Sequence, residues 1–229
     1  MCSIIAANKQ REYDLVFLEN RDKPKELYIG NDVRRIGDVI GVYDFRARGI
    51  ATGYSIASET AGGVANILGY LGTKSRGVLL FEALREGISA KGVARFIESE
   101  ASSGNYGSAS YVICDKNSIF NIESFGQKIR AREFYRRKFF VATNHLHILD
   151  EGKKSKDSYL REQYLKRLGK ISEESVLKFA TNHRNPAICR HGRTLASYVV
   201  FKRHNDKSVK ILYSIGEPCK GYKVFPKTN

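Results

Sequence analysis

The chain opens with Met1-Cys2-Ser3-Ile4-Ile5-Ala6-Ala7, in which a reactive side chain is followed at once by an apolar run. The apolar run predicts a strand over residues 2–7. The small residue at position 2 favours removal of Met1, which would leave Cys2 with both a thiol and a free α-amine. Such an amine titrates near pH ~7.7–8.0 and can take the thiol proton, so the residue would supply its own base. The alternative is a small buried residue that only opens a strand.

A second strand is expected over residues 15–19, joined to the first by a polar turn as an antiparallel hairpin. The polar triplet Asn20-Arg21-Asp22 follows directly. An amide, a guanidinium and a carboxylate at a strand end can hold an ammonium group, orient a thiolate and fix a carbonyl. In an extended chain, Asn20 and Asp22 share one face. A charged turn is the alternative interpretation.

The rest of the sequence alternates blocks of strands with pairs of helices. Helices are expected at 75–88, after a cap at Ser89, along 160–168, and after a start at Ser172, because apolar residues recur there every three or four positions. Within a predicted strand, Asn66 is either a satisfied structural amide or a donor aimed into a site. The expected strands are 39–43, 49–57, 63–68, 108–114, 119–123, 128–134, 139–143, 195–202, 209–214 and 222–225.

This order predicts an α+β fold. It lacks the regular βαβ alternation of a doubly wound parallel sheet and shows no repeat of 20 to 50 residues. Two antiparallel sheets packed face to face, each covered by a helix pair, fit the order. We therefore predict a four-layer αββα sandwich in which residues 1–229 form one domain.

The composition is that of a globular protein with a strong basic excess. Lys and Arg outnumber Asp and Glu by 39 to 24, a net charge of +15, which suits an anionic substrate, a nucleic acid or an acidic partner. The densest basic stretches, 128–138 and 153–170, interleave basic with apolar positions, which favours solvated faces over nucleic-acid binding. With no apolar run long enough for a membrane span and no secretory signal, we expect a cytoplasmic protein without membrane association.

Cysteine and histidine spacing gives no sign of a metal site. The four cysteines are widely separated without a Cys-x-x-Cys pair, which argues against a zinc ribbon and a disulfide framework. His145 and His147 are two residues apart, but no third ligand stands at a recognisable spacing. We expect neither a metal nor a cofactor.

Several motifs in this order resemble cysteine-type N-terminal-nucleophile (Ntn) hydrolases, in the branch of bile-salt hydrolases, penicillin V acylases and isopenicillin N acyltransferase. The triplet and Ser75-Arg76-Gly77 also resemble the related family named for its Asn-Arg-Asp-Glu signature. The motifs are Met1-Cys2, Asn20-Arg21-Asp22, Gly63-Val64-Ala65-Asn66, Thr143-Asn144-His145, Thr194-Leu195-Ala196-Ser197 and Gly216-Glu217-Pro218-Cys219.

The resemblance implies the αββα fold and cleavage of a linear amide other than a peptide bond. It implies that Cys2 is the nucleophile with its α-amine as base. Asp22 would hold that amine and Arg21 would lie beside the sulfur, while Asn66 and Asn144 would shape the oxyanion site. We place Asn20, His145 and Ser197 at the substrate.

The sequence also departs from these families. Bile-salt hydrolases have the Arg three residues before the Asp, whereas Arg21 directly precedes Asp22. The terminal Glu of the Asn-Arg-Asp-Glu signature is Lys23 here. A further family position, Arg in one branch and Ser in another, falls near Ser197, with Arg193 nearby. Because only Met1 precedes Cys2, we expect no propeptide.

The leading hypothesis is a hydrolase acting on a small acylated amine, with an acyltransferase on the same fold as the alternative. The basic surface favours anionic substrates or acyl carriers. The contrasting hypotheses are a basic nucleic-acid-binding protein, for which no recognisable motif is present, and a non-catalytic binding module. The sequence leaves a homo-oligomer open.

Overall fold

The structure is a computed structural model that describes residues 2–22, 31–134, 139–146 and 156–226. Its first sheet has six strands in the order β10-β1-β2-β11-β12-β13, with every neighbouring pair antiparallel. The expected hairpin of β1 and β2 forms its second and third strands. The strands are β1 (Ser3–Asn8), β2 (Tyr13–Asp22), β10 (Phe139–Thr143), β11 (Thr194–Arg203), β12 (Val209–Ile215) and β13 (Lys223–Val224).

The second sheet is a seven-stranded antiparallel meander that follows the chain order from β3 to β9. Each strand pairs with the next one along the chain, so most connections are short, whereas the connection from β6 to β7 carries two helices. The strands are β3 (Asn31–Ile36), β4 (Val39–Asp44), β5 (Gly49–Ser55), β6 (Thr60–Asn66), β7 (Ala109–Cys114), β8 (Ile119–Phe125) and β9 (Lys128–Glu133).

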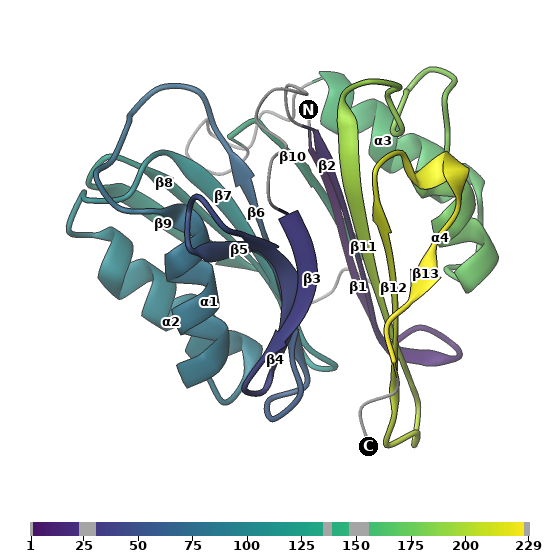
Figure 1. The fold of residues 1–229 in the computed structure, drawn as a ribbon, viewed down its shortest axis with the longest axis horizontal. Helices are drawn as coiled ribbons and strands as arrows, with labels where there is room; N and C mark the ends of the chain where they lie inside the picture. The colour runs from purple at the N-terminus through teal and green to yellow at the C-terminus, as the bar shows by residue number, and fades with distance from the viewer. Residues whose placement is uncertain (1, 23–30, 135–138, 147–155, 227–229) are drawn as a thin grey trace.

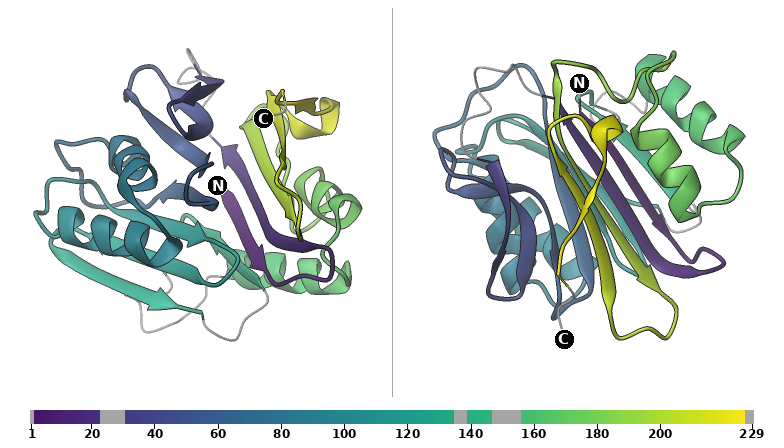
Figure 2. Two further views of the ribbon diagram at one scale, coloured as in Figure 1. Left: turned by 90° about the horizontal axis from the view of Figure 1, so that it is seen from below. Right: turned by 45° about the vertical axis from the view of Figure 1, so that its right-hand side comes forward.

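Two helix pairs cover the outer faces of the sheets, as Figures 1 and 2 show. The helices are α1 (Arg76–Glu86), α2 (Ala90–Ala101), α3 (Lys156–Arg167) and α4 (Glu173–Ala180). Ser75, Ser89 and Ser172 cap α1, α2 and α4 through their side-chain oxygens, as the sequence predicts. The four-layer αββα sandwich is therefore confirmed. Among the residues placed by the structure, no helix has the length and apolar character needed to cross a membrane.

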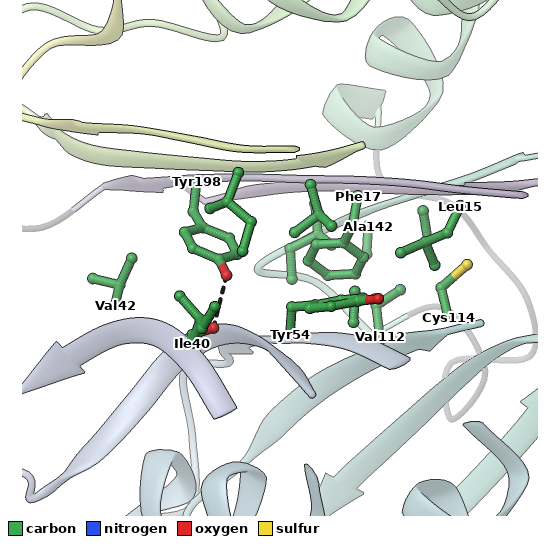
Figure 3. Packing of buried hydrophobic residues seen from close by; sticks show 14 of the residues in the cluster. Leu15, Phe17, Ile40, Val42, Tyr54, Val112, Cys114, Ala142 and Tyr198 are labelled. Carbon is green, nitrogen blue, oxygen red and sulfur yellow. Dashed lines mark hydrogen bonds between the residues drawn. The ribbon is translucent and has the colours of Figure 1, made fainter. Parts of the chain in front are cut away.

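The period-two alternation of the strands divides the core into three layers. Ile4 and Ala6 of β1 point between the sheets, whereas Ile5 and Ala7 point toward α3 and α4. A third cluster fills the space between the seven-stranded sheet and α1 and α2. Figure 3 shows the inter-sheet layer, where the Tyr198 hydroxyl of β11 donates to the Ile40 carbonyl of β4 across 2.7 Å.

Some elements differ from the sequence-based expectation. Strand β3 was not predicted because its sequence, NDVRRI, is mostly polar and it lies at a sheet edge, where one side pairs with no other strand of the described residues. The polar triplet lies inside β2, which continues to Asp22. Ile88, the last residue of the helix expected at 75–88, is 89% exposed because α1 ends at Glu86.

Candidate active site

Cys2 directly precedes the first residue of β1, between β10 and β2, and its side chain is buried between the two sheets. Its main-chain nitrogen donates a hydrogen bond to Oδ1 of Asn144, which directly follows β10. Nδ2 of Asn144 donates to the main-chain oxygen of Asn66, the last residue of β6, across 2.6 Å. The structure thus brings together Cys2, Asn144 and Asn66, three residues that the sequence places at the site, and the Asn144 amide bridges the two sheets.

The thiol of Cys2 lies 3.9 Å from the carbonyl oxygen of Asp22. The Asp22 carboxylate accepts a hydrogen bond of 2.7 Å from Oγ1 of Thr194 at the start of β11. The same Oγ1 accepts from the main-chain nitrogen of Arg190, also at 2.7 Å. These bonds fix the end of β2 beside Cys2, and the expected contact between the Asp22 carboxylate and an α-amine stays a prediction.

Arg21 projects toward the inter-sheet side of β2, where its Nη2 lies 3.3 Å from Oδ2 of Asp44. Only 14% of the Arg21 side chain and 10% of the Asp44 side chain are exposed, so the pair is screened little by water. Burial and the charge of Glu19 raise the pKa of the Cys2 thiol, and the positive charge of Arg21 acts in the opposite direction. Arg21 is therefore near enough to favour the thiolate.

Glu19 is a site residue that the sequence analysis missed. It is buried between the sheets, and neither carboxyl oxygen has a hydrogen-bond partner of ordinary geometry among the described residues. Burial raises its pKa to about 8, against the opposing effects of Arg21 and the Thr52 hydroxyl. Gly63 of β6 makes the room, since a Cβ there would lie 2.6 Å from Oε2 of Glu19. The signal in the sequence was the alternation of Leu15, Phe17 and Glu19 on one strand face.

Arg161 of α3 is a second residue near Cys2 that the sequence did not predict. It is 2% exposed, and its Nη1 donates to the Cys2 carbonyl oxygen at 3.2 Å and to the Ser3 hydroxyl. Its Nη2 donates to the carbonyl oxygen of Ala187 at 3.3 Å. The basic stretch 153–170 was interpreted as a solvated face, which is wrong for Arg161. This side chain fixes the start of β1 from the helix side.

Asn20 and Ser197, expected at the substrate, lie on the opposite face of the six-stranded sheet from the Cys2 side chain. Nδ2 of Asn20 donates to the Ala180 carbonyl of α4, and the Ser197 hydroxyl donates to Oδ1 of Asn20, both at 2.7 Å. The Ser197 hydroxyl also contacts the Tyr222 hydroxyl at 2.8 Å. These polar groups are buried and mutually satisfied, so the geometry gives them a structural role under α4. His145 is exposed in the turn after Asn144, and His147 lies outside the described residues.

A cavity of 410 Å³ opens between the sheets' ends and α1, and both Arg21 and Asn66 line it. Lys74 and Arg76 add two cationic groups to its wall, whereas Asp44 is the acidic group among its lining residues. Arg76 is fixed by a 2.8 Å bond from Nη1 to the Ser108 carbonyl. The cavity therefore offers a basic binding space next to Arg21 and Asn66, two of the expected site residues, whereas Cys2 is not among its lining residues.

A separate group of side chains has the chemistry of metal ligands. His183, Cys189, His191 and Cys219 come together in the structure, although their spacing in the sequence matches no common metal motif. The site around Cys2 contains no such group among the described residues.

The order and packing of the layers define the fold of the Ntn hydrolases. The structure is similar to that of penicillin V acylase from Agrobacterium tumefaciens, with a TM-score of 0.57 over 92% of this chain and 82% of that chain. The sequences are 10% identical over this match, so the similarity concerns the fold. No family model and no curated protein match the sequence.

Proposed function

We propose that the protein is an amidase that cleaves a linear amide of a small acylated amine, other than a peptide bond, through a thioester on Cys2. The observation that carries the proposal is the hydrogen-bonded series from the Cys2 nitrogen through Asn144 to Asn66, which ends at a basic cavity. This arrangement fixes the atom that would be the α-amine once Met1 is removed, and it holds the Asn144 amide against the main chains of Cys2 and Asn66.

The proposed reaction has two steps. The sulfur of Cys2 attacks the carbonyl carbon while the α-amine takes the thiol proton, and the C–N bond then breaks as that proton passes to the leaving amine. Water, deprotonated by the same α-amine, attacks the thioester, and the carboxylic acid leaves as the thiol is restored. Amide donors of Asn66 and Asn144 would stabilise the oxyanion in both steps.

The electrostatics of Cys2 explain why a base is needed. Burial and Glu19 raise the pKa of the thiol, so it is protonated at neutral pH in the chain as described. Arg21 assists the charged form but does not remove the proton. A free α-amine on the same residue is suitably placed to do so, which makes loss of Met1 the activating event of this proposal.

Intact-mass measurement combined with a thiol-directed alkylating probe at neutral pH tests the proposal. We expect protein lacking Met1 and labelling of Cys2 far faster than of the other thiols. Cys2→Ser should lose turnover of an N-acyl 4-nitroanilide panel, whereas Cys114→Ala, which replaces a thiol in the inter-sheet core, should retain it. Retained Met1 on active protein, or turnover by the Cys2→Ser variant equal to wild type, would contradict the mechanism.

The cavity supports an anionic substrate. Lys74 is exposed at the cavity wall, with its Nζ 5.6 Å from the centre of the Tyr106 ring. Lys74→Met should raise KM for a carboxylate-bearing substrate by up to about fivefold, the size of one partly screened ion pair, and leave KM for a neutral analogue unchanged. An equal change for both substrates would argue against charge recognition by this residue.

Hydrolysis and acyl transfer share the thioester and differ in its acceptor. Added hydroxylamine competes with water, so formation of a hydroxamate at the expense of the acid shows that the acyl group reaches other nucleophiles. We expect hydrolysis to dominate when water is the acceptor present. A requirement for an added amine or thiol would assign the chain as an acyltransferase.

A further inference from the structure

Two cysteines and two histidines meet on the outer side of the six-stranded sheet, between the loop that follows α4 and the short helix η2 (Pro218–Lys220). One ligand atom from each of His183, Cys189, His191 and Cys219 lies within 4.8 Å of every other. Cys189 is buried and the other three are exposed. The group therefore combines an anchored thiol with side chains that an ion can reach from solvent.

The donor set suits one metal geometry in particular. Two sulfurs and two imidazole nitrogens in a tetrahedron are the usual ligands of structural Zn²⁺, and bond lengths of about 2.0–2.3 Å place neighbouring ligand atoms roughly 3.3–3.8 Å apart. Nε2 of His191 and Sγ of Cys219 are 3.3 Å apart. The remaining separations need to shorten by at most about 1 Å to reach this range.

The second contact of His183 favours a metal-binding tautomer. Its Nδ1 lies 3.2 Å from the carbonyl oxygen of Cys189. Since a carbonyl only accepts, this bond requires the proton on Nδ1 and leaves the lone pair on Nε2. Zinc-bound histidines usually donate their other ring nitrogen in this way, which fixes the ring and raises its basicity.

The loop that carries three of the ligands is already ordered by its own hydrogen bonds. The main-chain oxygen of Asn182 accepts from the nitrogens of Ile188 and Cys189 at 2.9 and 3.0 Å. The Gly192 nitrogen donates to Oε1 of Glu217 at 2.8 Å, which ties the loop to the segment before Cys219. Little rearrangement is then required when an ion binds, because the backbone positions of the ligands are set.

We propose that His183, Cys189, His191 and Cys219 form a structural Zn²⁺ site that fastens the α4–β11 loop to the segment after β12. The two negative charges of the Cys189 and Cys219 thiolates would balance the double positive charge of Zn²⁺. A disulfide between Cys189 and Cys219 would use the two sulfurs but would leave the convergence of both histidines unexplained.

The site would act on the region around Cys2 through the loop. Ala187 in this loop accepts from Arg161, which also holds the Cys2 carbonyl, and Arg190 donates to Thr194, which holds Asp22. An ion that fixes the loop therefore stabilises both supports of the β1 and β2 ends. This role does not depend on the proposed amidase activity.

Metal analysis of the purified full chain, followed by Co²⁺ titration of the chelator-treated protein, tests the proposal. We expect one equivalent of zinc per chain and, with Co²⁺, the intense visible bands of a tetrahedral site together with sulfur-to-cobalt charge transfer. The chelator should lower Tm, and zinc should restore it. These measurements do not involve turnover. The zinc proposal can therefore fail while the amidase proposal stands, and the amidase proposal can fail while the zinc proposal stands.

Matched variants locate the site. Cys219→Ala and His191→Ala change exposed ligands and should weaken zinc binding by at least about 100-fold, more than the loss of an outer hydrogen bond costs. Cys114→Ala and His204→Ala remove the same residue types outside the cluster and should bind zinc as wild type does. Circular dichroism of each variant shows that it is folded before the Co²⁺ titration.

Two results would overturn the proposal. One is a folded, reduced protein that gives no tetrahedral Co²⁺ spectrum at any concentration. The other is a metal-free native protein that is two hydrogens lighter than expected, with Cys189 and Cys219 in one linked peptide, which would assign the pair as a disulfide.

Discussion

Glu19 carries a carboxyl group into the space between the two sheets, where its pKa is raised to about 8 from 4.5. Below pH 4.5 the group is protonated in both the folded and the unfolded chain, and between these two values only the unfolded chain releases the proton. The stability of the wild type should therefore fall as pH rises through this window and level off above about 8.

Glu19→Gln removes this titration, so we expect the variant and the wild type to differ little at pH 4.5 and to diverge as the pH rises. One kcal/mol shifts Tm by roughly 2–4 °C for a chain of this size, and we expect a gain of at least about 4 °C at pH 8. Thermal melts between pH 4.5 and 9 measure this difference in Tm between the variant and the wild type. Glu123→Gln, which replaces another buried carboxyl that accepts from Asn121 at 3.0 Å, is the control. Parallel curves for Glu19→Gln and wild type would contradict the prediction.

Asn144 uses both ends of its amide, one toward the Cys2 nitrogen and one toward the Asn66 oxygen. Asn144→Ala should lower kcat by about 100-fold or more, the usual effect of losing a donor or an orienting group at an oxyanion site. The pH profile of Cys2 alkylation should shift as well, since the nitrogen loses its fixed position. Asn117→Ala, in the exposed β7–β8 turn, is the matched control. Unchanged alkylation would mean that Asn144 does not position Cys2.

Motif order in the sequence predicts some residues of the candidate site, whereas the position of others depends on how the layers pack. Cys2, Asn66 and Asn144 were placed at the candidate site by the order of the motifs, and the fold brings them together, while their catalytic roles stay predictions. Glu19 and Arg161 were missed because a charged residue on an apolar strand or helix looks solvated until the facing layer is known. Asn20 and Ser197 have the right residue types, but alternation along β2 and β11 points them toward α4.

At the scale of elements, α3 shows how a helix can be predicted while its contacts are not. Leu160, Tyr164 and Leu168 form the apolar stripe of the helix expected along 160–168, yet the buried residues of α3 are Ser158, Arg161 and Leu165. Tyr164 and Leu168 pack at the margin of the core. The helix turns these polar residues inward because Ser158 bonds to the Thr143 hydroxyl of β10. Arg161 bonds to the Cys2 carbonyl, the Ser3 hydroxyl and the Ala187 carbonyl, and no periodicity within the helix can reveal such partners.

Arg161→Leu tests this role of α3. It leaves the oxygens of Cys2, Ser3 and Ala187 without their donor, and each buried unsatisfied group costs about 1–3 kcal/mol. Together the three groups cost about 3 kcal/mol or more, and because one kcal/mol corresponds to roughly 2–4 °C, we expect Tm to fall by at least about 6 °C. Lys166→Ala on the same helix removes a surface ion pair with Glu162 of 3.1 Å and should change Tm by about 1–2 °C at most. Equal melting of the Arg161→Leu variant and wild type would show that these bonds do not support the fold.

Across the whole molecule, local patterns predicted the layers but could not predict which distant residues meet. The sandwich follows from strand and helix blocks, each of which must bury its apolar face. The convergence of His183, Cys189, His191 and Cys219 depends instead on the path of two loops, which carry no periodic signal. The hydrogen bond between Tyr198 and Ile40 likewise joins residues that are far apart in the sequence, and no local pattern predicts it.

The shared inter-sheet core predicts how the whole chain unfolds. Leu15, Phe17 and Tyr198 of one sheet pack against Ile40 and Tyr54 of the other (Figure 3), so neither sheet can keep its inner face buried alone. We expect one cooperative calorimetric transition with an enthalpy near 60 °C of about 160 kcal/mol, from about 0.7 kcal/mol for each of the 229 residues. Tyr198→Phe deletes the bond to Ile40 without a cavity and should lower the single Tm by roughly 2–8 °C. Two separate transitions in either protein would show that the sheets are independent units, because a common core requires them to unfold together.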